Sequence, residues 1–209
     1  GNAGTVLRSA DAVGANAVVF SPSSVDVYNA KTVRASAGSL FHLPVVRGRR
    51  TEEAIEVLRS SGMRILAMDA DGDADLYEQD LSDPVTFVFG NEAWGLPKEV
   101  ASLADATVRV PIRGRAESLN LAAASTVCLF EWERQRREGR RAVLATIIAA
   151  AAHDFRSPLA AIMGWAELLE GQAEAAVDER RARAQAIIGA ASRMAALMDR
   201  TLETTRLET

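Results

Sequence analysis

The first ten residues combine residue types that could hold an anionic or polar ligand. They read GNAGTVLRSA, so that Asn2 and Gly4 precede an expected helix carrying Arg8. Glycine permits close approach of a backbone, and the first N–H groups of a helix attract anions. An Asn-x-Gly turn followed by an ordinary amphipathic helix remains the structural alternative.

A second segment leads from an apolar strand into a polar loop that contains two glycines. Residues 87 to 97 read FVFGNEAWGLP, with Gly90, Glu92 and Gly95 following the strand. Ligands of open α/β sheets bind just beyond the carboxyl ends of the strands. The segment therefore predicts a cofactor loop, in which Trp94 either shields the ligand or packs against the protein.

A third segment has a basic loop between a strand and a helix. Residues 108 to 125 read VRVPIRGRAESLNLAAAS, where Ile112 ends the strand and Ser118 and Asn120 open the helix. A polar residue at a helix start normally caps it. The neighbouring basic side chains, which are either a binding surface or a solvated rim, are Arg109, Arg113 and Arg115.

Alternation of strands and helices predicts the scaffold that positions these loops. Short apolar runs, typical of strands buried in a parallel sheet, are 17–20, 64–68, 85–89 and 107–110. Helical patterns occupy 4–13, 29–37, 51–60, 97–103 and 119–137. We therefore expect an α/β fold with a mostly parallel sheet and flanking helices over residues 1–137.

A different pattern begins after Arg141, where the chain is rich in Ala, Arg, Glu and Leu and has one turn signal at 171–178. This predicts an all-α helical hairpin over 138–209. The charged run 132–141 would join the two domains as a helix, with a solvated spacer as the simpler interpretation, and Gly139 could interrupt it. Its second helix has an apolar stripe at three- and four-residue spacing: Ile187, Ile188, Ala191, Met194, Ala195, Met198 and Leu202. The hairpin would bury this stripe in a four-helix dimer or against the first domain.

Composition limits the possible classes of protein. The chain has 209 residues and a formal net charge of −4, which argues against coating of nucleic acid by charge alone. The one cysteine, Cys128, excludes an internal disulfide and fits the cytoplasm. We expect Ser125 and Cys128 in the core, a structural His42, no metal site and no membrane span, because the longest apolar run, 142–152, is too short.

The three segments, taken in order, resemble the three motifs of the SpoU (TrmH) branch of the SPOUT methyltransferases. The matching patterns are Asn-x-Gly-Thr-x-x-Arg, Phe-Gly-Asn-Glu-x-x-Gly-Leu, and Val-Pro-Ile followed by Glu-Ser-Leu-Asn, within about residues 1–135. The resemblance implies a trefoil-knotted sheet and S-adenosylmethionine as the cofactor. It implies that the cofactor-binding residues are Phe89, Gly90, Ile112, Leu119 and Leu121.

The same resemblance implies transfer of a methyl group to the ribose 2′-hydroxyl of an RNA, either rRNA or tRNA, by a homodimer. The implied catalytic residues are Asn2, Arg8, Glu92, Ser118 and Asn120, and the implied RNA-binding residues are Arg8, Arg113 and Arg115. Because guanidinium groups stay protonated, Arg8 is expected to orient RNA and stabilise charge rather than act alone as a base. The family's domains normally have a strand before the first motif, and we expect that strand to be absent here.

The hairpin has a resemblance of its own. Residues 153 to 169, HDFRSPLAAIMGWAELL, resemble the phosphoacceptor helix of histidine kinase dimerisation domains. This implies that His153 accepts phosphate, that Asp154 acts as acid or base, and that Pro158 kinks the helix. No ATP-binding domain is recognisable, so we expect no autonomous kinase activity; a kinase acting in trans or a response regulator would be the partner.

Two functions therefore compete. The chain is an RNA 2′-O-methyltransferase carrying a helical dimerisation element, or a signalling protein whose methyltransferase domain only binds RNA or cofactor. We also expect it to be a piece of a longer fusion.

Overall fold

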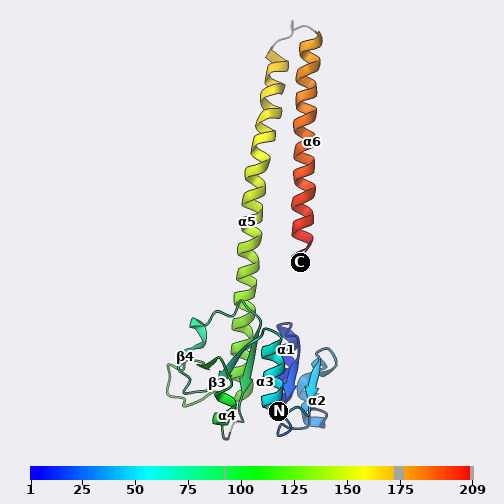
Figure 1. Ribbon diagram of the computed structural model, residues 1–209. Coiled ribbons are helices and arrows are strands. Elements are labelled where there is room, and N and C mark those ends of the chain that lie inside the picture. The colour runs from blue at the N-terminus through cyan, green and yellow to red at the C-terminus, as the bar shows by residue number, and fades with distance from the viewer. Residues whose placement is uncertain (92, 172–176, 208–209) are drawn as a thin grey trace. The chain divides into compact units, whose positions relative to one another are not determined.

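The computed structural model describes residues 1–91, 93–171 and 177–207. The chain divides into two compact units, Gly1–Arg137 and Glu138–Thr209. The first contains alternating helices and strands, and the second contains long helices (Figure 1). The boundary falls within one continuous helix, α5 (Leu121–Gly171), which Gly139 does not interrupt.

The elements of the first unit follow the expected alternation closely. The helices are α1 (Asn2–Ala12), α2 (Ala30–Ser36), α3 (Thr51–Ser60) and α4 (Lys98–Ala101), with 3₁₀ turns η1 (Ser39–Phe41) and η2 (Leu76–Glu78). The strands are β1 (Val18–Phe20), β2 (Val45–Arg47), β3 (Arg64–Met68), β4 (Ala74–Asp75), β5 (Val85–Phe89) and β6 (Ala106–Arg109). The predicted bounds of α3, β3 and β5 are confirmed residue for residue, whereas the short β2 and β4 were not predicted.

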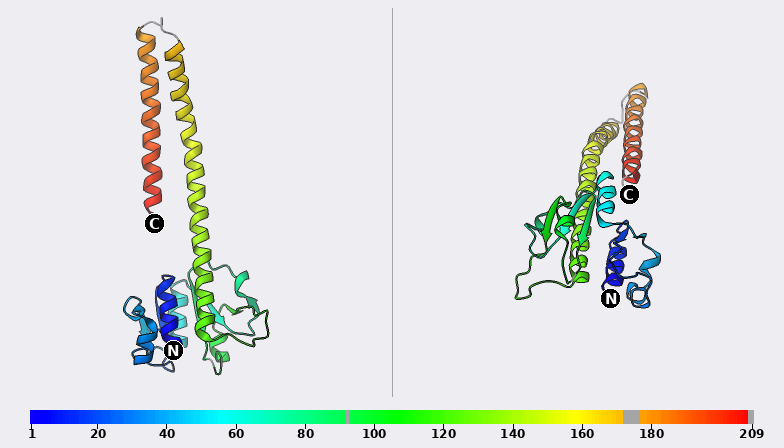
Figure 2. Two further views of the ribbon diagram at one scale, coloured as in Figure 1. Left: turned by 180° about the vertical axis from the view of Figure 1, so that it is seen from behind. Right: turned by 60° about the horizontal axis from the view of Figure 1, so that its bottom comes forward.

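All the strand pairs are parallel, and they form two sheets rather than one. β1 pairs with β2 in the register Val18 to Val45, and the larger sheet has the order β4-β6-β3-β5. Among the strands of the described residues, β1 pairs only with β2, and β5 only with β3. Figure 2 shows the larger sheet beside the first turns of α5. The mostly parallel α/β fold is confirmed, and the trefoil knot stays a prediction.

The main core lies between the larger sheet and α5. Leu66 and Val108 of the sheet pack in one cluster with Cys128 and Trp132 of the helix. Burial raises the pKa of the Cys128 thiol to about 12, so the thiol stays neutral. Ser125 is also buried and donates a hydrogen bond to the Ala122 carbonyl. The prediction that Ser125 and Cys128 serve packing is therefore confirmed.

Helix α1 begins two residues earlier than predicted and packs closely on α2. The Gly1 carbonyl accepts hydrogen bonds from the amides of Gly4 and Thr5, so Asn2 and Gly4 lie inside the first turn rather than before it. A Cβ atom on Gly4 would lie 2.5 Å from the Thr32 carbonyl oxygen. Glycine at this position is thus required by the contact between the two helices.

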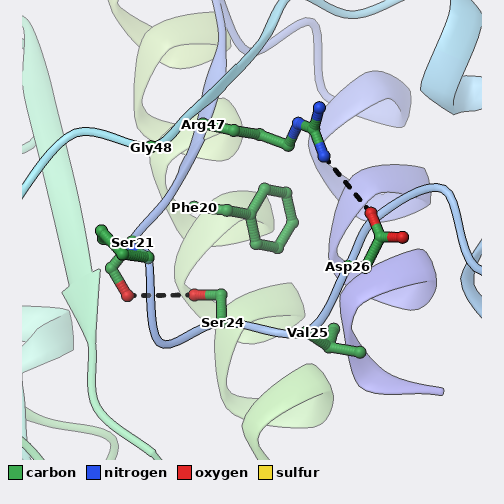
Figure 3. A pocket seen from close by; sticks show the side chains of 8 residues that line it. Phe20, Ser21, Ser24, Val25, Asp26, Arg47 and Gly48 are labelled. Carbon is green, nitrogen blue, oxygen red and sulfur yellow. Dashed lines mark hydrogen bonds and ion pairs between the residues drawn. The ribbon is translucent and has the colours of Figure 1, made fainter.

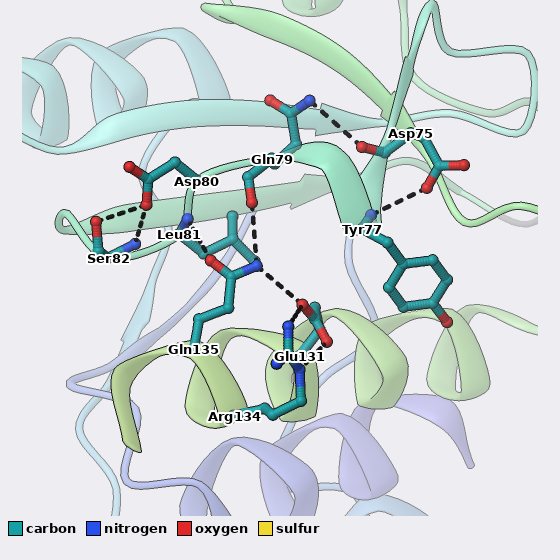
Figure 4. A network of polar contacts seen from close by, with 9 residues as sticks. All are labelled: Asp75, Tyr77, Gln79, Asp80, Leu81, Ser82, Glu131, Arg134 and Gln135. Carbon is teal, nitrogen blue, oxygen red and sulfur yellow. Dashed lines mark hydrogen bonds and ion pairs between the residues drawn. The ribbon is translucent and has the colours of Figure 1, made fainter. Parts of the chain in front are cut away.

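A polar network fastens α5 to the turn around η2 (Figure 4). The Gln135 side chain accepts a hydrogen bond from the Leu81 amide (2.9 Å) and donates one to the Gln79 carbonyl (3.0 Å). It also donates to Glu131, which is 8% exposed and is bound by the Arg134 guanidinium. The beginning of the charged helix is therefore an integral part of the first unit and not a solvated spacer.

The second unit is a hairpin of α5 and α6 (Val177–Leu207), which run antiparallel (Figure 1). Pro158 lies inside α5. Part of the predicted apolar stripe is uncovered in the single chain, since Ile188 is 64% and Met198 is 48% exposed. None of the helices in the described ranges is long and apolar enough to cross a membrane.

Candidate active site

The first and third motifs meet through two asparagines. Asn120 Nδ2 donates a hydrogen bond to Asn2 Oδ1 at 3.3 Å, across 118 positions of sequence. A second link joins the same helices, because the hydroxyl oxygens of Ser9 and Thr126 lie 2.8 Å apart. The start of α1 is therefore held against the start of α5, as the predicted catalytic set requires.

Asn120 also caps α5. Its Oδ1 accepts hydrogen bonds from the Ala122 amide (3.0 Å) and the Ala123 amide (3.4 Å), and its carbonyl accepts one from the Ala124 amide. The helix therefore starts at Leu121 and not at the predicted Leu119. The cap fixes the side chain so that its amide nitrogen faces Asn2.

The loop after β5 is a tight turn. Asn91 and Gly95 exchange two backbone hydrogen bonds of 3.0 and 2.7 Å, and Gly95 has a φ of +68°. A Cβ atom on Gly90 would lie 2.1 Å from the Gly95 carbonyl carbon, so only glycine fits there. Trp94 is 88% exposed, which contradicts the alternative that it packs against the protein. The predicted catalytic Glu92 lies outside the described residues.

The second and third motif loops leave the same edge of the larger sheet. β5 and β6 both pair in parallel with β3, so their carboxyl ends flank the end of that strand. This is the edge at which α/β sheets bind ligands.

Apolar surface is available along these loops. Phe89, Ile112 and Leu121 are half-buried, and Leu119 is 40% exposed. Partly covered apolar side chains at the carboxyl edge of a sheet suit a ligand with a flat apolar ring. The residues present therefore fit the cofactor predicted from the sequence.

The basic residues of the region do not have equal roles. Arg8, Arg113, Arg115 and the polar Ser118 are exposed and accessible to a large ligand. Arg109, in contrast, donates a hydrogen bond to the Gly72 carbonyl at 2.6 Å. This contact secures the turn before β4, so Arg109 has a structural function and does not belong to a free basic surface.

In the second unit, the predicted phosphoacceptor is accessible. The His153 side chain is 80% exposed, and its Nδ1 lies 3.3 Å from Asp154 Oδ1. An exposed imidazole beside a carboxylate is sterically free to receive a phosphoryl group. In contrast, the described ranges contain no group of three His, Cys, Asp or Glu side chains that could hold a metal ion.

One further feature of the first unit was not predicted from the sequence. A hollow of about 380 Å³ lies at the ends of β1 and β2, where Phe20, Asp26 and Arg47 contribute to the lining (Figure 3). The signal in the sequence was the run RGRR at 47–50, directly after the unpredicted strand β2.

The parallel sheet has the second and third motif loops at its carboxyl edge, and the two motif asparagines join the first motif to the third. This arrangement is typical of α/β domains that bind ligands at strand ends. Residues 1–130 match the family model of the SpoU rRNA Methylase family, and the chain belongs to that family. Residues 143–209 match the model of the His Kinase A (phospho-acceptor) domain. Both resemblances predicted from the motifs are thereby confirmed.

Several relatives are rRNA methyltransferases. The chain is 42% identical over 147 residues to a 23S rRNA (uridine(2479)-2′-O)-methyltransferase of Streptomyces viridochromogenes, covering 68% of the chain and 51% of that protein. It is 35% identical over 130 residues to the 23S rRNA (guanosine(2553)-2′-O)-methyltransferase RlmP of Bacillus subtilis, covering 62% of the chain and 52% of that protein. The chain thus spans about half the length of these relatives.

Solved structures agree with this assignment. The SpoU methyltransferase AviRb from Streptomyces viridochromogenes, in complex with AdoMet, superposes with a TM-score of 0.62 at 40% identity, covering 66% of this chain and 56% of AviRb. An AdoMet-bound rRNA methyltransferase from Sinorhizobium meliloti gives a TM-score of 0.60 at 42% identity, covering 64% of this chain and 51% of that one.

Proposed function

We propose that residues 1–137 catalyse S-adenosylmethionine-dependent methylation of a ribose 2′-hydroxyl in RNA, either rRNA or tRNA. The observation that carries the proposal is the hydrogen bond between Asn120 and Asn2, which unites the first and third motifs. The activities named for the relatives and the AdoMet complexes of the solved structures support it.

The cofactor would bind where the second and third motif loops leave the sheet. Backbone groups near Gly90 would bind its polar edges, and Ile112 and Leu119 would contact the adenine ring. Phe89 and Leu121 would complete the apolar surface. S-adenosylmethionine supplies an electrophilic methyl group when it is bound.

The protein's contribution to the reaction would be orientation. Holding a nucleophile in line with an electrophile can supply much of the rate acceleration without covalent help from the enzyme. Arg8 would bind an RNA phosphate and stabilise charge near the 2′-oxygen, with Arg113 and Arg115 contacting the RNA backbone. Asn2, Glu92, Ser118 and Asn120 would position the ribose.

The hairpin has a second candidate function, favoured by the exposed His153 beside Asp154. It would accept phosphate from a kinase acting in trans or exchange it with a response regulator. The uncovered apolar residues of α6 would pair two chains into a four-helix bundle, making the protein a homodimer. We place the protein in the cytoplasm, where its RNA substrates are.

Transfer of radioactive methyl groups tests the enzymatic proposal directly. The full chain is incubated with tritiated S-adenosylmethionine and bulk rRNA or tRNA, and the RNA is then hydrolysed in alkali. A 2′-O-methyl group blocks alkaline cleavage, so the label should be recovered in resistant dinucleotides. Label confined to mononucleotides, or absence of transfer to either RNA by a folded chain, would contradict the proposal.

The variant Arg8→Ala tests whether Arg8 contributes to methyl transfer. Arg8 is exposed on α1, so its removal should leave folding intact. We expect methyl transfer to fall by roughly a hundredfold, because the loss of a positioning contact has effects of that order. A melting temperature that falls in parallel with activity would argue against an orienting role.

A further inference from the structure

The side chains of Arg47 and Tyr28 form a pre-arranged pair beside the hollow at the carboxyl ends of β1 and β2. Phe20 and Arg47 are the last residues of the two strands and are paired in register. The Arg47 guanidinium carbon lies 4.3 Å from the centre of the Tyr28 ring. Both side chains remain accessible: that of Arg47 is 47% exposed and Tyr28 is 56% exposed.

Asp26 holds this pair in place. Its Oδ1 accepts a hydrogen bond from the Tyr28 amide at 3.1 Å and one from Arg47 Nη1 at 3.3 Å, the latter visible in Figure 3. The guanidinium group is therefore held over the aromatic ring before any ligand binds. Pre-arrangement of this kind lowers the entropic cost of binding.

The surroundings of the pair are polar and basic. The Ser21 hydroxyl lies 3.0 Å from that of Ser23 and 3.1 Å from that of Ser24, so the rim presents several hydroxyl groups. Arg49 and Arg50 follow Arg47 on the exposed surface, and Arg50 pairs with Glu52 at 3.6 Å. The local positive charge contrasts with the net charge of −4 of the whole chain.

The hollow is connected with the candidate active site by α2. Tyr28 immediately precedes Asn29, the residue that caps this helix, and Lys31 lies in its first turn. The position that a Cβ on Gly1 would take lies 3.6 Å from Lys31 Cε. A strip of exposed side chains, comprising Arg47, Arg49, Tyr28 and Lys31, thus extends to the residue next to Asn2.

We propose that this strip binds single-stranded RNA beside the nucleotide that is methylated. A base would stack on the Tyr28 and Arg47 pair, and the adjoining phosphates would contact Arg49 and Lys31. Unstacked RNA bases bind to aromatic rings and Arg planes, and cations that follow the backbone supply affinity. Exposed arginines beside an accessible aromatic ring favour a nucleotide over a docked protein.

The identification of the ligand as RNA rests on the proposed function, but binding at the strip can be tested separately. The probe is a fluorescein-labelled, mixed-sequence RNA strand of about ten nucleotides. Its affinity for the full chain is measured by fluorescence anisotropy at several salt concentrations. The variants are Tyr28→Ala and the double variant Lys31→Gln/Arg49→Gln, and Arg181→Gln on the exposed surface of α6 is the control for loss of charge.

The two variants should change RNA affinity and its salt dependence differently. Tyr28→Ala should weaken binding by about tenfold with an unchanged salt dependence, because stacking does not release counterions. The double variant should reduce the slope of log K against log salt by about 1.4, since each phosphate contact in a single strand accounts for about 0.7. Arg181→Gln should bind as the unaltered chain does.

The proposal would be overturned if both variants bound the RNA with the same affinity as Arg181→Gln. It would also be overturned if the unaltered chain did not bind the RNA. Near-ultraviolet circular dichroism verifies that the variants are folded. Failure of the proposed function would give another result, namely RNA binding through the strip by a chain that does not bind S-adenosylmethionine.

Discussion

Asn120 and Asn2 are hydrogen-bonded at 3.3 Å although 118 positions separate them in the sequence. The contact depends on the cap of α5, since the Oδ1 of Asn120 is occupied by the Ala122 and Ala123 amides while its Nδ2 is directed to Asn2. One side chain thereby begins a helix and completes the junction between two motifs.

The two functions of Asn120 can be separated by substitution. Asn120→Asp keeps an oxygen that caps the helix but removes the donor to Asn2, so the melting temperature should change little while methyl transfer falls by roughly a hundredfold. Asn120→Ala removes both and should also cost about 1 kcal/mol of unfolding free energy. Equal losses of stability and activity in both variants would show that the residue serves folding only.

Gly90 is expected to be essential to the cofactor loop. In Gly90→Ala the new methyl group would overlap the backbone at Gly95, so the turn must open. We expect the affinity for S-adenosylmethionine, measured by calorimetric titration, to decrease by more than about tenfold, because the loop's N–H groups are displaced. Gly114→Ala is the matched control, since a Cβ there meets nothing within 4 Å; a similar loss in both would refute this explanation.

Glu131 should make the first unit sensitive to acid. Its hydrogen bond with Arg134 lowers its pKa below the ordinary value of 4.5. A lowered pKa means that the stabilisation is present above 4.5 and is lost as the pH falls through the folded-state value. Glu131→Gln should therefore lower the free energy of unfolding by about 1 kcal/mol at pH 7, with the difference vanishing in acid.

Urea denaturation followed by near-ultraviolet circular dichroism measures this difference at a series of pH values. If Glu131→Gln lowered the free energy of unfolding by the same amount from pH 7 to acid pH, the stabilisation would come from packing and not from the charge of Glu131.

His153 should be the acceptor in the hairpin. With ATP and the catalytic domain of a histidine kinase added in trans, the full chain should incorporate phosphate that is labile in acid and stable in alkali. His153→Gln should abolish this label and leave the oligomeric state unchanged in sedimentation, because the side chain is 80% exposed and contributes little packing. Label retained by the variant would exclude His153 as the acceptor.

The sequence was sufficient for the elements whose patterns are local. The apolar runs of β3 and β5 and the acidic first turn of α3 predict their bounds correctly. The short β2 and β4 were missed because two or three residues carry too weak a pattern. The helix α5 was expected to be interrupted at Gly139, but a single glycine in a long helical pattern does not end it.

The site was predictable where the motifs hold residues of a recognisable type, as at Asn2 and Asn120. It was not predictable where tertiary contacts decide a residue's function. The burial of Gly4 against α2 and the hydrogen bond of Arg109 to Gly72 depend on the packing of distant segments. The stacking of Arg47 on Tyr28 likewise requires two strands to be brought into register.

Isothermal titration of the full chain with S-adenosylmethionine is the decisive test of the proposed methyltransferase site, because binding requires both motif loops and the junction at Asn120 together. We expect saturable binding of one molecule per chain, which is lost in Gly90→Ala and retained in Gly114→Ala. A folded chain that takes up no S-adenosylmethionine would contradict it.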